Sequence, residues 1–196
     1  FAASMSMELS NQKKLSEFYE ELKRLNINII RPDINECYAD FSSDGKNFLY
    51  ALGAIKNVGY EAISKIVEER KMNGKFKDLS DFIKRVNPKD INKLQLEGLV
   101  KAGVFDNLNN NRQSLFNSIP NIILKSKNIF ENNSANQIDL FEDVDDETYI
   151  EKIEDWNIDV KLSKEFETLG FFISDHPLKQ YRSIFNQYNI INYEEF

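Results

Sequence analysis

The feature that most constrains the fold of this chain is a unit that occurs twice: a helix, a tight turn with a small residue, and a second helix. The first unit is LGAIKNVGYEAISKIVEER (residues 52–70), where a turn at residues 57–59 precedes a predicted helix from Tyr60 to about Met72. The second is LQLEGLVKAGVFDNLNNNRQSLF (residues 94–116), in which Gly103 opens the turn. A short predicted helix, residues 78–86, lies between them. Two such units require a largely helical chain.

The remaining segments agree with this fold class. Seven glycines and four prolines in 196 residues are few for an all-β sandwich with many tight turns. Apolar residues at helical spacing predict a helix over residues 11–25, and another over residues 90–102. Short alternating segments around residues 43–45 predict one β-hairpin. We therefore expect a mainly α chain: a tandem helix–hairpin–helix module with one small β-hairpin, a mobile linker and a C-terminal helical segment.

Several classes of protein are excluded by the residue counts. Cys37 is the only cysteine, so an internal disulfide is impossible and a reducing compartment is expected. With His176 as the only histidine, a Cys/His zinc site built from this chain alone is also excluded. The sequence has no run of about 18 apolar residues, so we expect no membrane association. Because the chain starts with Phe rather than Met, we expect it to be a piece of a longer polypeptide.

The net charge of −7 is distributed unevenly along the chain. Residues 46–112 carry 13 basic and 8 acidic side chains, whereas residues 131–196 carry 5 basic and 16 acidic side chains. The middle of the chain is therefore a basic module within an acidic protein. The local electrostatic field of this module matters more to a polyanion than the net charge of the whole chain does.

The turns of the two helical units are candidate phosphate sites. At the start of each second helix, backbone N–H groups without intrahelical partners are available to a phosphate oxygen, and glycine permits a close approach. Basic side chains add attraction without reading any base. The candidate DNA contacts are Lys56, Asn57, Val58, Gly59, Lys65, Lys84, Arg85, Lys101 and Gly103. The alternative is an ordinary helical hairpin that is packed for its own stability.

A second candidate site lies in the polar, acidic stretch NSANQIDLFEDVDDE (residues 133–147). Ile138, Leu140 and Phe141 are large apolar side chains in a segment with no predicted helix or strand to bury them. Such a cluster is typical of a peptide that a partner buries. The alternative is that these side chains pack against a neighbouring helix of the same chain.

The ordered segments FAASMSMELSN, ELKRLNINIIRPDIN, YALGAIKNVGYEAISKIVEER, FKDLSDFIKRV, LEGLVKAGVFDNL and LGFFISDHPL together resemble the alpha subunits of bacterial DNA polymerase III, the replicative C-family polymerases. The resemblance covers essentially the whole chain. It implies four regions: the end of the fingers domain (1–36), the β-hairpin and tandem helix–hairpin–helix DNA-binding module (37–118), a linker with the sliding-clamp motif (119–150), and a helical segment that leads toward an OB domain (151–196).

The resemblance also implies partners. The family's internal clamp-binding motif resembles Gln-x-x-Leu/Met-Phe, which corresponds here to Gln137, Ile138, Asp139, Leu140 and Phe141. Duplex DNA of any sequence, the beta sliding clamp and other subunits of the holoenzyme are the implied partners, in a cytoplasmic, nucleoid-associated replisome. The family's first hairpin usually reads Ile-Lys-Gly-Val-Gly. Asn57 replaces its first glycine here, and Asn is the non-glycine residue best able to adopt a left-handed backbone.

No catalytic residue is expected in this chain. In the family the aspartates that hold Mg²⁺ lie in the palm domain, upstream of these residues, so the parent polymerase needs Mg²⁺ and this segment needs no cofactor. We expect His176 and Trp156 to be structural. Two other classes remain open: a freestanding helix–hairpin–helix module of the repair type, and a helical protein–protein adaptor. Within the family, an error-prone alpha-type polymerase is a further alternative.

Overall fold

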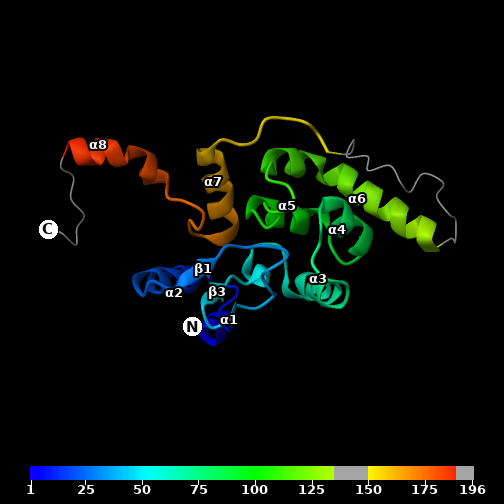
Figure 1. Ribbon diagram of the computed structural model, residues 1–196, viewed down its shortest axis with the longest axis horizontal. Coiled ribbons are helices and arrows are strands. Elements are labelled where there is room, and N and C mark those ends of the chain that lie inside the picture. Colours follow the sequence, from blue (N-terminus) through cyan, green and yellow to red (C-terminus); the bar gives the residue numbers. More distant parts are fainter. Residues whose placement is uncertain (135–149, 189–196) are drawn as a thin grey trace.

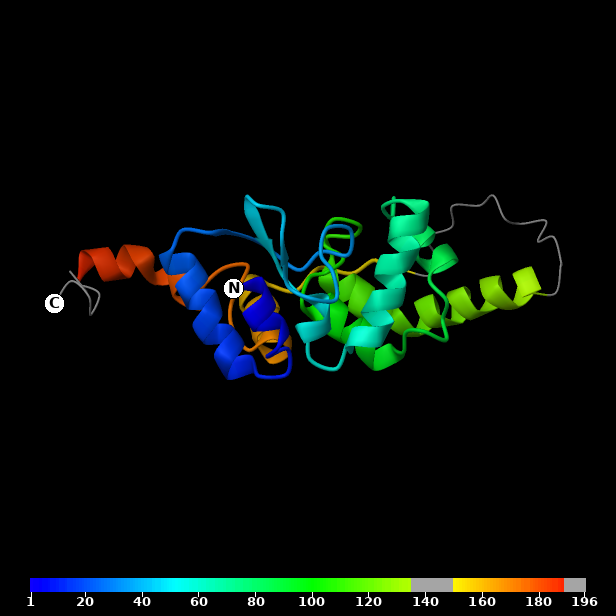
Figure 2. The same cartoon turned by 90° about the horizontal axis from the view of Figure 1, so that it is seen from below.

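The computed structural model describes residues 1–134 and 150–188, and it has an elongated, mainly helical form (Figure 1). Helix α6 extends to one end and α8 to the other (Figures 1 and 2). The helical elements are α1 (Ala2–Ser6), α2 (Gln12–Arg24), η1 (Leu52–Ala54), α3 (Tyr60–Asn73), α4 (Leu79–Arg85), α5 (Lys93–Lys101), α6 (Arg112–Ser134), α7 (Ile158–Leu169), η3 (Pro177–Tyr181) and α8 (Arg182–Gln187). The prediction of a mainly α fold is confirmed.

Side-chain caps determine where several helices begin. Asn11 accepts a hydrogen bond from the Lys14 N–H at the start of α2, and Asp78 accepts one from the Asp81 N–H at the start of α4. The helix predicted from residue 90 begins later, at Lys93. The reason is a capping box in which Asn92 and Gln95 satisfy each other's backbone N–H groups.

The small sheet has three strands in the order β1–β3–β2. The predicted hairpin is present: β2 (Ser42–Ser43) runs antiparallel to β3 (Asn47–Leu49). In its turn, Asp44 Oδ1 accepts hydrogen bonds from the N–H groups of Asn47 and Lys46, which lower the pKa of this carboxyl to about 2. The sequence did not predict β1 (Asn28–Ile30), which pairs in parallel with β3. This pairing joins residues on both sides of the predicted boundary at residue 36.

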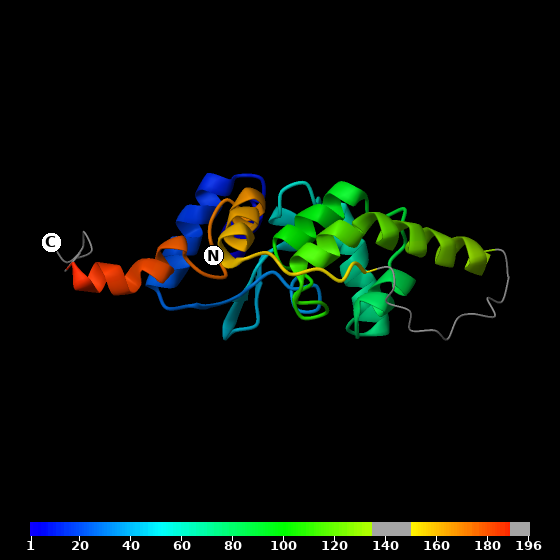
Figure 3. The same cartoon turned by 90° about the horizontal axis from the view of Figure 1, so that it is seen from above.

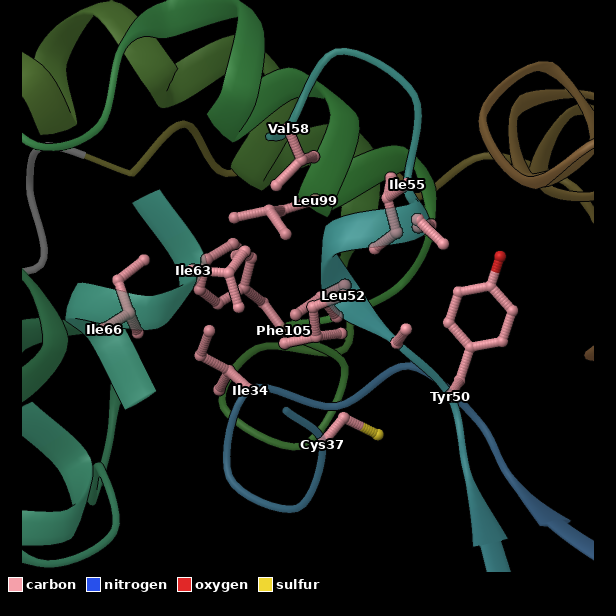
Figure 4. Close-up of a cluster of buried hydrophobic side chains, with 14 of the residues drawn as sticks. Ile34, Cys37, Tyr50, Leu52, Ile55, Val58, Ile63, Ile66, Leu99 and Phe105 are labelled. Carbon is pink, nitrogen blue, oxygen red and sulfur yellow. The ribbon is translucent and has the colours of Figure 1, made fainter. Parts of the chain in front are cut away.

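The main core lies where the sheet region meets α3 and α5. Figure 4 shows aliphatic side chains from these elements converging, among them Ile34, Leu52 and Ile63. Arg70 of α3 donates to the Ile34 carbonyl oxygen at 2.5 Å, and the Ile34 N–H donates to the Val104 carbonyl oxygen at 3.0 Å. The loop that contains Ile34 is therefore hydrogen-bonded to both helical units.

Helix α6 corrects the predicted start of the linker. The predicted linker starts at residue 119, whereas α6 continues through Pro120 to Ser134. Proline removes one N–H donor. Burial of Ile119 and Ile122, on either side of it, favours continuation of the helix.

After residue 149 the chain returns to the first half of α6. We call residues 150–157 the return segment (yellow in Figure 3). The Glu151 N–H donates to Ser118 Oγ at 2.8 Å, and Asn111 Nδ2 donates to the Ile153 carbonyl oxygen at 2.7 Å. The Trp156 ring packs against Phe116, with 5.4 Å between ring centroids. Trp156 is thus a packing anchor, as expected.

The C-terminal segment contains α7, η3 and α8. His176 Nδ1 accepts a hydrogen bond from the Leu178 N–H at 3.2 Å and so caps η3, which agrees with the structural role expected for it. Within residues 1–134 and 150–188, no helix combines the length and the apolar character that crossing a bilayer would require.

Candidate nucleic-acid interface

The turn of the first helical unit, which we call the first hairpin, is residues 55–59 between η1 and α3. Asn57 has φ +67° and Gly59 has φ +80°. The left-handed backbone expected at Asn57 is therefore present. Lys56, Asn57 and Gly59 are exposed, while Val58 is fully buried and anchors the turn in the core.

The N-terminus of α3 is open at this turn. Gly59 is its N-cap and has no side chain that could cap it. The N–H groups of Tyr60 and Glu61 have no hydrogen-bond acceptor in the part of the chain that the structure describes. Two donors and the positive end of the helix dipole therefore face outward, where an anion is favoured.

A groove of about 620 Å³ lies over this turn. Its lining comes from the loop before α2 and the first residue of α2, from residues 53–60 and from α5, and it includes Leu9, Gln12, Lys56, Gly59, Tyr60 and Gln95. Tyr60 is half exposed, and its hydroxyl donates to Asp40 at 2.8 Å. The groove thus combines backbone donors, one lysine and an aromatic side chain on a single surface.

Helix α5 packs against the first hairpin and stabilises its turn. Gln95 Nε2 donates to the Val58 carbonyl oxygen at 2.6 Å, while Gln95 Oε1 accepts from the Asn92 N–H at 2.8 Å. Gly98 allows the close approach, because a Cβ there would lie 3.0 Å from both the Lys56 carbonyl oxygen and Val58 Cγ2. The shape of the turn therefore depends on both helical units.

The second hairpin, residues 102–111 between α5 and α6, is closed instead of open. Gly103 has φ +76° and is buried, and a Cβ there would overlap the Arg112 guanidinium. That guanidinium donates to Asp106 at 2.8 and 2.6 Å. Its Nη1 also lies 3.9 Å from Oε2 of Glu165, a fully buried residue of α7. Gly103 therefore makes room for Arg112, which corrects its predicted place among the surface DNA contacts.

The predicted basic contacts divide into two groups. Lys56 and Lys84 are exposed. Arg85, with a side chain that is 16% exposed, donates to Glu69, to Asp81 and to the Gly74 carbonyl oxygen, and its guanidinium lies over the Phe76 ring. Lys101 is paired with Glu167 at 2.8 Å and is 15% exposed. Arg85 and Lys101 therefore make ion pairs within the fold: Arg85 with Asp81 and Glu69, and Lys101 with Glu167, which lies 66 residues away in sequence.

Lys65 belongs between these two groups. It remains exposed on α3 but forms an ion pair with Asp90. Such a surface pair contributes little to stability, so a phosphate competes with it readily. The predicted clamp contacts, Gln137 to Phe141, lie outside the described residues.

Similarity to known proteins extends over both hairpins. The family described as "Helix-hairpin-helix motif" matches residues 26–115, which contain both hairpins. DNA polymerase III subunit alpha of Caulobacter vibrioides is 37% identical over 181 residues, which are 91% of this chain and 16% of that protein. The same subunit of Borreliella burgdorferi is 34% identical over 97% of the chain, and that of Campylobacter jejuni is 35% identical over 98% of it. The chain belongs to the DNA polymerase III alpha subunit family. It spans about a sixth of the length of these alpha subunits.

Two groups that contact the hairpins of this alpha-subunit segment are not among the residues predicted from the sequence. Gln95 was signalled by its spacing from Asn92, since Asn followed three residues later by Gln is a capping-box pattern. Asp155, which contacts the start of α6, carried no local signal because its partner lies 42 residues away. Among the residues described, no cluster of three or more His, Cys, Asp or Glu side chains is arranged to hold a metal ion.

Proposed function

We propose that this chain is the part of a DNA polymerase III alpha subunit that holds duplex DNA by its backbone. The open N-terminus of α3 at the first hairpin, within the region that matches the helix–hairpin–helix family, is the observation that carries the proposal. The N–H groups of Tyr60 and Glu61 would donate to a phosphate oxygen, and Lys56 would add attraction. Because these groups contact only the backbone, binding would be independent of sequence.

The parent polypeptide would then be a DNA-directed DNA polymerase that uses Mg²⁺ at residues outside this chain. The role of this segment would be to retain the duplex near the catalytic domain. A phosphate site without base contacts suits that role, because the enzyme must move along DNA of every sequence.

Fluorescence anisotropy with two labelled duplexes of unrelated sequence tests the proposal. Both duplexes should bind with the same affinity, which should fall steeply as salt rises from about 50 to about 200 mM. Lys56→Glu should weaken binding about tenfold, while Lys127→Glu, the same charge change at an exposed position on α6, should weaken it less than about twofold. Equal effects of the two changes would contradict a site at the first hairpin.

We further propose that Gln137, Leu140 and Phe141 bind the beta sliding clamp as a short peptide. The support is the sequence pattern Gln-x-x-Leu-Phe within a polar, acidic stretch. Two buried apolar side chains contribute roughly 3–6 kcal/mol before the cost of ordering the segment, which suits a contact that exchanges during synthesis.

Surface-immobilised clamp tests this second proposal. The wild-type chain should bind, and a Leu140→Ala/Phe141→Ala variant should not. As a control, Asp145→Ala/Asp146→Ala alters the same stretch without altering the motif and should retain binding. If the Leu140→Ala/Phe141→Ala variant binds as well as the wild-type chain, the contact lies elsewhere on the protein.

A further inference from the structure

The two hairpins of this chain differ in whether the first backbone N–H groups of the helix after each turn have a hydrogen-bond acceptor. At the first hairpin, the leading N–H groups of α3 have no acceptor in the described residues. At the second, the Ser114 N–H of α6 donates to Asn111 Oδ1 at 2.9 Å, and the Gln113 N–H donates to Asp155 Oδ1 at 3.1 Å. A carboxylate of the return segment therefore occupies the position in the second hairpin that an external anion would take in the first.

The return segment fixes Asp155 in this position. The contacts of Glu151 and Ile153 with Ser118 and Asn111 hold the segment along the first two turns of α6. The Asp155 side chain is 23% exposed and also forms an ion pair with Lys161 of α7. Burial opposes ionisation of Asp155, but the hydrogen bonds from Lys161 and from the Gln113 N–H lower the pKa of its carboxyl below the ordinary value. Asp155 is therefore an anion at neutral pH.

Two acidic side chains of α7 lie close to the basic groups of the second hairpin. Glu167 pairs with Lys101, and Glu165 lies near Arg112. We propose that Asp155 permanently fills the anion site of the second hairpin, so that only the first hairpin receives a DNA phosphate. This inference rests on the proposed function and specifies which half of the tandem module performs it.

Removal of Asp155 is the most informative test. In Asp155→Ala, the Gln113 N–H and Lys161 become available, so duplex affinity should rise about two- to fivefold and the salt dependence should steepen by about one phosphate contact. Glu154→Ala is the matched control, since Glu154 is exposed and next in sequence but does not cap α6. The duplex affinity of Glu154→Ala should differ from that of the wild-type chain by less than the duplex affinity of Asp155→Ala does. An equal gain from both variants would mean that net charge alone is responsible and would overturn the inference.

Three further variants complete the test, and the first of them separates an effect on binding from an effect on folding. Asp155→Asn removes the charge but keeps an oxygen acceptor, so it should fold normally and give a smaller gain than Asp155→Ala. In the wild-type background, Lys101→Ala should change duplex affinity less than about twofold, whereas Lys56→Ala should weaken it several-fold. A wild-type chain that binds no duplex would overturn the proposed function and this inference with it. Binding that Lys101→Ala weakens as much as Lys56→Ala would overturn this inference alone.

Discussion

At the scale of single residues, Gly103 shows how a glycine that was predicted for ligand contact can instead serve the fold. Ala at this position would meet two penalties: φ of +76° and a clash with the Arg112 guanidinium. Because the buried guanidinium must shift to admit a methyl group, Gly103→Ala should lower the free energy of unfolding by about 2–3 kcal/mol, which is more than backbone strain alone would cost.

Gly45→Ala is the matched control for this prediction, since Gly45 has φ +88° but a Cβ added there would have no neighbouring atom within 4 Å. It should cost about 1 kcal/mol from backbone strain alone. Urea denaturation of both variants gives the comparison. Equal losses would show that Arg112 moves aside without cost, which would contradict the packing described here.

Tyr50 offers a second prediction at this scale. Its hydroxyl is buried and has no hydrogen-bond partner among residues 1–134 and 150–188, while its ring contacts Phe41 and Phe171. Tyr50→Phe keeps the ring and removes the unsatisfied group, so the protein should become more stable by up to about 1 kcal/mol. A loss of stability in urea denaturation would show that the hydroxyl has a partner.

At the scale of elements, the return segment should respond to acid through Asp155. The pKa of this carboxyl in the folded protein is lower than its value of 3.8 in an unfolded chain. Its contribution to stability is therefore complete above about pH 5, and it is lost as the pH falls through 3.8 toward the folded-state pKa.

Thermal denaturation of the wild-type chain and Asp155→Asn between about pH 7 and about pH 3 measures this effect. The wild-type chain should be the more stable at neutral pH, and the difference in Tm should shrink as the pH falls. A difference that stays constant over this range would contradict an ionised Asp155 at the start of α6.

The elements also show which parts of the fold were accessible from sequence. Apolar spacing and polar caps are local, and they predicted α2, α3 and α4 nearly to the residue. The short strand β1 and the helical residues beyond Pro120 were missed because pairing with β3 and burial of Ile122 stabilise them. The open first hairpin was predictable from Asn57 and Gly59. The closed second hairpin was not, because Asp155, Glu165 and Glu167 reach it from a distant segment.

At the scale of the whole molecule, Cys37 reports on global unfolding. Burial raises the pKa of its thiol to about 12, and its Sγ donates to the Arg31 carbonyl oxygen at 3.3 Å. Cys37 lies in the core shared by the sheet region and both helical units (Figure 4). Its reaction with a thiol reagent at neutral pH should therefore proceed only through unfolding, at a rate that follows the urea dependence of unfolding. A fast reaction without denaturant would indicate local opening of this core.

In the proposed function, the N-terminus of α3 at the first hairpin binds a DNA phosphate. Titration of the isotopically labelled chain with duplex DNA, followed by the chemical shifts of its backbone amides, tests it most directly. The largest changes in chemical shift should occur at Gly59, Tyr60 and Glu61, with little change at Gln113 and Ser114. Changes of equal size at both helix N-termini, or changes confined to Gln113 and Ser114, would contradict it.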